Sequence, residues 1–191
     1  MEESLFNYLD TIGKFSEEEK LGIMELIQLR YFKKGDTVLE VGKKTEDSYL
    51  VIKGCLRSFY IVDGEEKTTE FFTEEDIITP VCIRDNAPSK YSIACLEDTV
   101  LLVSNPQLEA IGYSRFPQFE MLCRVVSEKE LNKKQQQLDS FKILNPEDRY
   151  KKFLIDRPQL IQRVPQYQIA SYLGITPQSL SRLRKRIVFD K

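Results

Sequence analysis

The sequence predicts an α+β fold in which an antiparallel β-barrel is followed by a long helix and then by a helix-turn-helix. Three observations predict it: short β-prone runs between turn formers in residues 31–103, a polar helical run at 116–140, and a block at 166–183 spaced like two short helices joined through a glycine. The chain has 191 residues, of which 41% are hydrophobic and 30% charged, as is ordinary for a globular protein.

The first 30 residues are predicted to form short helices. Ser16 and Glu19 have the spacing of a capping box at a helix start. An apolar stripe at mostly helical spacing is expected to follow, made of Leu21, Met24, Leu26, Ile27 and Leu29.

The β-prone region is predicted to form a barrel of short antiparallel strands. The expected strands are residues 37–39, 48–52, 56–62, 68–72, 91–94 and 100–103. Asp63-Gly64, between two of these runs, is the strongest short-range signal for a hairpin.

Residues 116–140 predict one long helix, with its apolar positions at Phe119, Leu122, Val126, Leu131 and Leu138. A helix with so few apolar residues is not a buried core helix, so it either bridges two domains or pairs with its twin across a dimer axis. Asn145 and Pro146 then carry the N-cap and first-turn preferences of a new helix.

The block from Gln166 to Leu183 fits a helix-turn-helix. Ala170 lets two helices cross closely, and Gly174, four residues later, is a turn residue that tolerates positive φ. Thr176 is the expected N-cap of the second helix, and Pro177 its first residue. The shared core is expected to consist of Ile169, Leu173, Ile175, Leu180 and Leu183.

The polar side of the second helix predicts contact with double-stranded DNA. Gln and Arg side chains match the edges of adenine and guanine, and Lys and Ser bind phosphates or bases. The expected DNA-binding residues are Thr176, Gln178, Ser179, Ser181, Arg182, Arg184 and Lys185. Residues 141–191 contain 11 Lys and Arg against 4 Asp and Glu, whereas the rest of the chain is net negative, and this asymmetry favours a polyanionic partner.

Other function classes lack their chemistry in this sequence. It has no histidine and no glycine-rich nucleotide loop, so neither an enzymatic activity nor a cofactor is expected. The cysteines are too far apart for a metal site and are expected to be buried, inert thiols: Cys55, Cys82, Cys95 and Cys123. No apolar run is long enough to cross a membrane and no secretory signal is visible, so a cytoplasmic location is expected.

The whole chain resembles the Crp/Fnr family of transcription regulators. The resemblance rests on residues 32–36, Gly42, 47–54 and 60–65 in the barrel, and on Arg149 and residues 168–183 in the C-terminal part. It implies a cyclic-nucleotide-binding-type β jelly-roll at residues 1–115, a dimerisation helix at 116–140 and a winged helix-turn-helix at 141–191. It also implies a homodimer on a pseudo-palindromic operator with recognition helices about 34–36 Å apart. RNA polymerase would be a further partner if the protein is an activator.

The effector site departs from the family pattern. The family holds a cyclic phosphate with a Gly-Glu pair and with an Arg followed by Ser or Thr, whereas Thr79-Pro80 and Ser89-Lys90 stand in the matching regions here. Lys90 or Arg84 could hold another anion, but the bidentate geometry of the arginine is missing. Cyclic AMP is therefore not expected to bind. An effector pocket of another kind is expected at Thr79, Pro80, Arg84, Ser89 and Lys90. The chain also lacks the N-terminal cysteine cluster of the family's iron–sulfur sensors and the histidine of its haem sensors.

The sequence therefore predicts a homodimeric DNA-binding regulator of the Crp/Fnr type. An alternative stays open: a small-molecule-sensing barrel protein whose helical tail docks a protein partner rather than DNA. This alternative explains the barrel equally well, but it gives no reason for the basic tail or for the polar face of the last helix.

Overall fold

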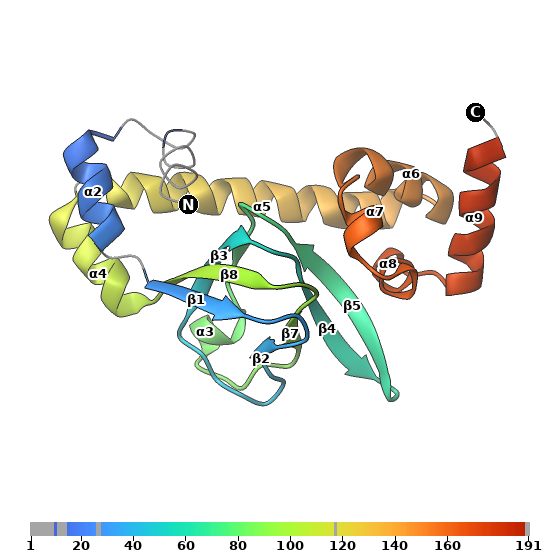
Figure 1. Ribbon diagram of the computed structural model, residues 1–191, viewed down its shortest axis with the longest axis horizontal. Coiled ribbons are helices and arrows are strands. Elements are labelled where there is room, and N and C mark those ends of the chain that lie inside the picture. The colour runs from blue at the N-terminus through green and yellow to red at the C-terminus, as the bar shows by residue number, and fades with distance from the viewer. Residues whose placement is uncertain (1–9, 11–14, 26–27, 117, 190–191) are drawn as a thin grey trace.

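The long helix α5 (Phe119–Ile143) extends along the molecule in the computed structural model, and the other elements lie beside it (Figure 1). Helices α2 (Glu17–Glu25) and α4 (Pro106–Arg115) lie at its first end, the strands beside its middle, and the C-terminal helices at its far end. The structure describes residues 10, 15–25, 28–116 and 118–189.

The β-domain consists of two four-stranded antiparallel sheets, with the strand orders β1-β8-β3-β6 and β2-β7-β4-β5. The strands are β1 (Gln28–Phe32), β2 (Thr37–Leu39), β3 (Ser48–Lys53), β4 (Leu56–Val62), β5 (Glu65–Phe72), β6 (Ile77–Ile78), β7 (Ser92–Cys95) and β8 (Thr99–Ser104). Because alternate residues of a strand face the same side, both sheets send apolar side chains into one core. The prediction of an antiparallel β-domain is confirmed, although β1, β6 and the short helix α3 (Cys82–Asp85) were not predicted.

The hairpin predicted at Asp63-Gly64 joins β4 to β5. Val62 pairs with Glu65, and the two turn residues have φ values of 52° and 78°. Two positive φ values in a two-residue turn match the right-handed twist of the flanking strands, which is why the Asp-Gly pair is favoured there. The prediction is confirmed.

The predicted start of the N-terminal helix is confirmed, but its predicted apolar stripe is wrong at Leu21 and Leu29. Ser16 N donates to Glu19 Oε2 at 2.8 Å and Glu19 N donates to Ser16 Oγ at 3.1 Å, which is a complete capping box. Among the described hydrophobic residues of this helix Ile23 is buried, whereas Leu21 is 60% exposed and Leu29 belongs to β1. The side chain of Met24 and residues 26–27 lie outside the described part of the chain.

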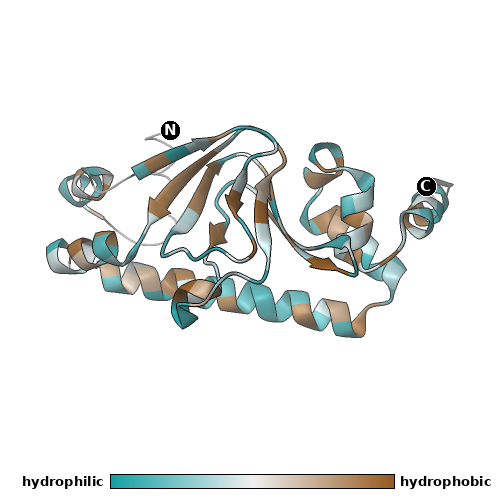
Figure 2. Cartoon of the chain, turned by 90° about the horizontal axis from the view of Figure 1, so that it is seen from below, coloured by the Kyte–Doolittle hydropathy of each residue, from teal (hydrophilic) through white to brown (hydrophobic). Residues whose placement is uncertain are grey.

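The long helix begins and ends about three residues later than predicted, at Phe119 and Ile143. Its middle is hydrophilic, as the teal stretch in Figure 2 shows, and Leu131 there is 70% exposed. Among its described residues the helix is therefore not a core element. No described helix is long and apolar enough to span a membrane.

The C-terminal part is helical: α6 (Pro146–Asp156), α7 (Leu160–Arg163), α8 (Gln166–Leu173) and α9 (Pro177–Phe189). Asn145 caps α6 as predicted, with Asp148 N donating to Asn145 Oδ1 at 3.0 Å, and Pro146 is its first residue. Between residues 144 and 189 the structure has helices and no strand, so the wing implied by the resemblance is absent from this range. We call residues 144–189 the helical unit.

Candidate nucleic-acid interface and effector groove

Helices α8 and α9 meet through the turn that the sequence predicted. Ala170 is fully buried, and Gly174 ends α8 with a φ of +69°. Ile175 N donates to Ala170 O at 3.0 Å, which closes the turn. Gly174 also lies against the Phe141 ring, since an added Cβ would come within 3.3 Å of it. Of the five predicted core residues, four are buried and Ile175 is partly buried against them.

The N-terminus of α9 is capped by Thr176. Ser179 N donates to Thr176 Oγ1 at 3.1 Å, and Leu180 N donates to Thr176 O at 3.0 Å. The hydroxyls of Thr176 and Ser179 lie 2.9 Å apart and are hydrogen bonded to each other. These two predicted DNA-binding residues thus build the helix start.

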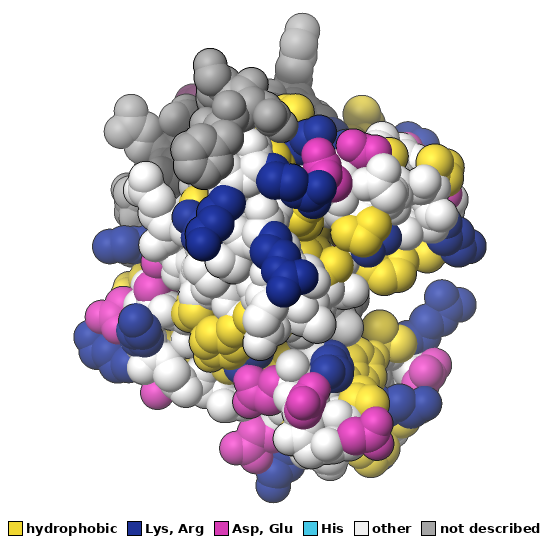
Figure 3. All heavy atoms as spheres, turned by 90° about the vertical axis from the view of Figure 1, so that its right-hand side faces the viewer, with side chains coloured by type: hydrophobic (Ala, Val, Ile, Leu, Met, Phe, Trp, Pro, Cys, Tyr) yellow, Lys and Arg dark blue, Asp and Glu magenta, His cyan; other side chains and the backbone are white. Residues whose placement is uncertain are grey.

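Four of the seven predicted DNA-binding residues share one exposed face of α9. Leu180 and Leu183 are buried, and at 3.6 residues per turn the opposite side of the helix is occupied by Gln178, Ser181, Arg182 and Lys185, which are all exposed. We call these four residues the reading face. Figure 3 views this end of the molecule, where dark-blue Lys and Arg side chains are spread over the surface.

Arg184 lies apart from the reading face. Its position on the helix is next to the buried stripe, and its guanidinium interacts with the Tyr150 hydroxyl. Burial raises the pKa of Tyr150, and the charge and hydrogen bond of Arg184 oppose that rise. Arg186, beside it, forms an ion pair with Glu147 at 3.2 Å. These two arginines therefore bind within the helical unit.

A groove of about 1380 Å³ runs between the β-domain, α5 and the helical unit. It exceeds the roughly 300–1,000 Å³ of an ordinary small-molecule pocket because it is open to solvent. Its β-domain section includes Tyr60 and Tyr91, whose ring centroids are 5.4 Å apart, and α5 adds Ser127 and Leu131. The section is lined mainly by aromatic, hydroxyl and apolar side chains.

Two of the five predicted effector residues line this groove, namely Thr79 and Arg84. The other three do not line it. Pro80 is fully buried, Lys90 is exposed away from the groove, and Ser89 is buried with its hydroxyl donating to Tyr91 O at 2.7 Å. No residue of the Ser89-Lys90 pair therefore stands where an anion in the groove would be held.

Glu70 and Asp76 join three parts of the molecule. Both side chains are close to 90% buried. Lys133 and Lys134 of α5 form ion pairs with Asp76 and Glu70. Arg157, at the end of α6, donates to Asp76 Oδ2 at 2.8 Å and to Phe71 O at 2.6 Å. Burial would raise the pKa of Asp76, but Arg157, Lys133 and the Thr73 amide outweigh burial and lower it.

Arg163 makes a second connection between the helical unit and the β-domain. Its Nη1 and Nη2 donate to the two carboxylate oxygens of Glu74 at 2.8 Å each, and its Nε donates to Glu97 Oε1 at 3.1 Å. Glu74 Oε1 also accepts from Gly54 N at 2.9 Å. No sequence motif marks these residues, so the sequence analysis missed this junction.

The ion pair of Glu74 is expected to make the junction sensitive to acid. Burial would raise the pKa of Glu74, but the hydrogen bonds from Arg163 and Gly54 outweigh it and lower the pKa from 4.5 to about 2. A lowered pKa adds stability that is complete above pH 4.5 and is lost as the pH falls towards 2. We expect the midpoint of urea unfolding to fall across this window, and to fall less in Glu74→Gln. An equal fall in both proteins would contradict the assignment.

The described cysteines are free thiols, and Cys55, Cys82 and Cys95 are buried. Burial raises the pKa of Cys55 to about 12, which leaves its thiol protonated and unreactive at neutral pH. In the part of the chain that the structure describes, no three Cys, Asp or Glu residues are arranged to hold a metal ion.

Comparisons with known proteins agree with this architecture. Residues 29–108 match the family model of the cyclic nucleotide-binding domain. The comparison with curated proteins gave no match. Among solved structures, FixK2 from Bradyrhizobium japonicum is 16% identical with a TM-score of 0.71, over 86% of this chain and 85% of that one. CLP of Xanthomonas campestris, described as a c-di-GMP responsive global regulator, is 15% identical with a TM-score of 0.67, over 89% and 92%. The catabolite activator protein of Thermus thermophilus is 18% identical with a TM-score of 0.56, over 94% and 86%.

At these identities the solved structures establish the fold. The order of a β-domain, a long helix and a helical C-terminal part is thus shared with regulators of the Crp/Fnr family. Residues 29–108 are thus similar to the cyclic nucleotide-binding domain, and the chain as a whole has a fold like that of the solved Crp/Fnr-type regulators.

Proposed function

We propose that the protein is a homodimeric transcription regulator of the Crp/Fnr type that binds a pseudo-palindromic operator in the cytoplasm. One observation carries the proposal: the reading face presents Gln178, Ser181, Arg182 and Lys185 to solvent, on a helix whose other side is fixed by buried Leu180 and Leu183. These side chains match base edges and phosphates. The proposed division is an effector domain at residues 1–115, then a dimerisation helix, then a DNA-binding unit from residue 141.

In vitro selection of bound DNA from a random pool tests the proposal. A dimer that reads DNA should enrich an inverted repeat whose half-sites lie about 10 base pairs apart, since two recognition helices enter successive major grooves. If the selection enriched no DNA sequence even at low salt, the proposal would be contradicted.

Salt dependence separates the proposal from docking of a protein partner. Binding that neutralises several phosphates weakens steeply as salt rises, because counterions are released from the DNA. A mostly apolar protein interface lacks this dependence. A nearly flat dependence of affinity on salt would therefore favour the alternative, in which the helical unit docks a protein.

The dimer is proposed to form through α5. The helix exposes Met121, Leu131 and Leu138, and Leu131 is 70% exposed in the middle of an otherwise polar stretch. A narrow seam of this kind is typical of a helix that pairs with its twin. RNA polymerase remains a proposed partner only for an activator.

Replacing Leu131 by glutamate is expected to shift the protein from dimer to monomer. Two facing carboxylates in a helix seam repel each other, and the apolar burial of the leucines is lost. The dissociation constant of the dimer should therefore rise by about tenfold or more. Sedimentation velocity measures the change. Leu21→Glu is the matched control, because Leu21 is 60% exposed on α2. If both variants sedimented as the wild type does, the seam would lie elsewhere.

The groove is proposed to be the effector site, and cyclic AMP is not its ligand. Arg84 is the cation that the β-domain contributes to the groove, and Ser89 and Lys90 do not line it. The groove therefore lacks the arginine that binds the cyclic phosphate with two hydrogen bonds in the family. A calorimetric titration is expected to show no binding, and a micromolar complex would overturn this part of the proposal.

A further inference from the structure

Two arginines of one short connection bind one short segment of the β-domain. Arg157 and Arg163 lie between α6 and α8, six residues apart in the sequence. Their acceptors lie within residues 70–76, apart from Glu97. We call the two residues the arginine clamp and residues 70–76 the acceptor segment.

We infer that the arginine clamp holds the helix-turn-helix at one orientation against the β-domain, and thereby sets the distance between the two reading faces of a dimer. This inference rests on the proposed function. It adds to it a pair of positioning residues that touch no DNA and act through the placement of α8 and α9.

The geometry of the clamp restricts rotation as well as distance. Arg163 binds Glu74 with two parallel hydrogen bonds of 2.8 Å, and such a planar fork fixes the direction of approach. Arg157 binds at a second point, with its side chain 13% exposed between acceptors that are 10% and 11% exposed. Two attachment points prevent the unit from turning about either of them.

The covalent connection alone would not fix this orientation. The helical unit is joined to α5 at Leu144, where the backbone leaves the helix in an extended conformation. Its other contacts with the sheet are centred on β5, where Thr68 N donates to Ser171 Oγ at 2.9 Å and the Phe71 ring packs on Tyr172. The clamp extends this contact beyond β5, to Glu74 and Asp76 and, through Arg163, to Glu97 in the turn before β8.

The acceptor segment also continues into the effector groove. Residues 77–79, which follow it directly, line the groove, as does Glu70 itself. Lys133 and Lys134 of α5 bind the same two carboxylates that meet the clamp. The clamp therefore attaches the helical unit to the stretch of chain that borders both the groove and α5.

The test measures how strictly the full-length dimer selects the distance between half-sites. The selected operator is rebuilt as a series in which spacers of different length separate the same two half-sites. The wild type is expected to lose about tenfold or more in affinity when the spacing departs by two base pairs from its optimum, because rigidly held reading faces match one spacing. Arg163→Gln is expected to lose less than about threefold over the same change, because its unit can turn to follow the DNA.

Three further proteins make the result decisive. Arg30→Gln is the matched control, because it removes an exposed ion pair of β1 with Asp47 and should keep the spacing profile of the wild type. Arg163→Lys keeps the charge without the fork, so its profile should lie between the two. Glu74→Gln removes the same pair from its more exposed partner, and serves if Arg163→Gln does not fold.

The outcomes distinguish the inference from the proposed function. A folded Arg163→Gln and a folded Glu74→Gln that both keep the wild-type spacing profile would overturn the clamp while leaving DNA binding intact. A wild type that enriches no operator would instead contradict the proposed function. A flattened profile in both variants, with Arg30→Gln unchanged, supports the clamp.

Discussion

Replacing Phe71 by alanine is expected to lower the free energy of unfolding by about 3–5 kcal/mol, since this is the usual cost of deleting a fully buried phenylalanine ring. Phe71 is 0% exposed, and its ring centroid lies 5.2 Å from that of Tyr172. Its side chain extends from β5 into the helical unit, where it packs in one cluster with Tyr150, Phe153 and Leu160. Its loss therefore opens a cavity between two parts of the protein rather than within one.

Chemical denaturation measures this change, and operator binding should weaken with it because the cluster supports α8. Tyr31→Ala provides the control, since Tyr31 is 68% exposed on β1 and should change the free energy of unfolding by less than about 0.5 kcal/mol. A loss below about 1 kcal/mol for Phe71→Ala would mean that the helical unit does not share a core with the sheet.

The elements that the sequence predicted are those whose signals are local. Asp63-Gly64 defines a hairpin within four residues, and Thr176-Pro177 defines the start of a helix within two. The Ala170 and Gly174 pair likewise acts between neighbouring helices. In each case the residues that cause the structure are adjacent in the chain, so their types alone are enough to predict it.

The ion pairs that join the helical unit to the β-domain could not be predicted, because the two residues of each pair are far apart in the sequence. Arg157 lies 81 residues from Asp76, and Arg163 lies 89 residues from Glu74. Strand β1 was missed for a related reason: its pairing with β8 is non-local, and Leu29 also fits a helical stripe. Nothing in the neighbourhood of such residues distinguishes them from solvated surface charges or from helix positions.

The predicted effector residues show how residues matched to a family by their order along the chain can lie apart in the structure. The chain between Thr79 and Tyr91 contains α3 and a left-handed Asn86 with a φ of 45°. This path buries Pro80 and turns the Ser89 hydroxyl to the backbone of Tyr91. Of the four residues matched by order along the chain, Thr79 lines the groove, whereas Pro80, Ser89 and Lys90 do not.

The double variant Gln178→Ala/Arg182→Ala is expected to remove most of the sequence preference of the proposed DNA binding. Each base-reading contact contributes about 1–3 kcal/mol, so two should cost about 2–6 kcal/mol on the operator if their effects add. Binding to scrambled DNA should fall much less, because phosphate contacts supply most of that affinity. A titration of both DNAs at one salt concentration gives the two values.

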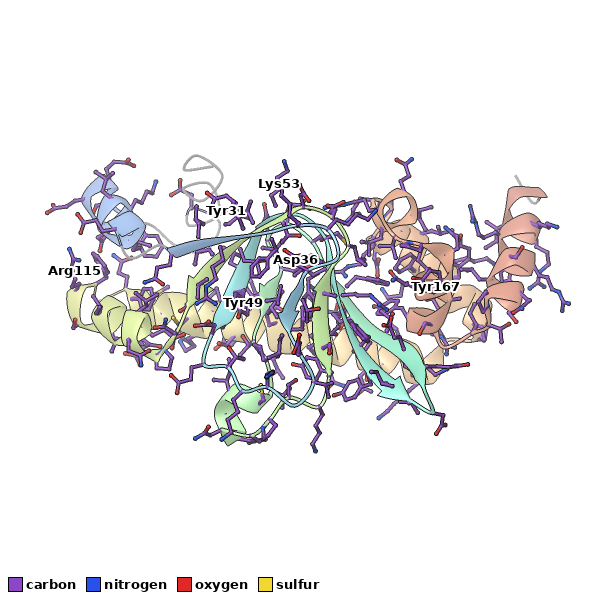
Figure 4. All side chains as sticks on the ribbon, turned by 60° about the horizontal axis from the view of Figure 1, so that its bottom comes forward. Tyr31, Asp36, Tyr49, Lys53, Arg115 and Tyr167 are labelled. Carbon is purple, nitrogen blue, oxygen red and sulfur yellow. The ribbon has the colours of Figure 1, made fainter. Side chains whose placement is uncertain are left out.

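The control for this variant must remove a positive charge without touching the reading face. Arg115→Ala does so, because Arg115 lies at the opposite end of the molecule from Tyr167 and the helical unit (Figure 4). Equal losses on operator and scrambled DNA would assign the reading face to phosphate binding alone. A loss confined to the operator is the expected result, because only base edges carry sequence and the phosphate contacts of Lys185 remain. The affinity ratio of the two DNAs, rather than either affinity, therefore decides whether α9 reads sequence.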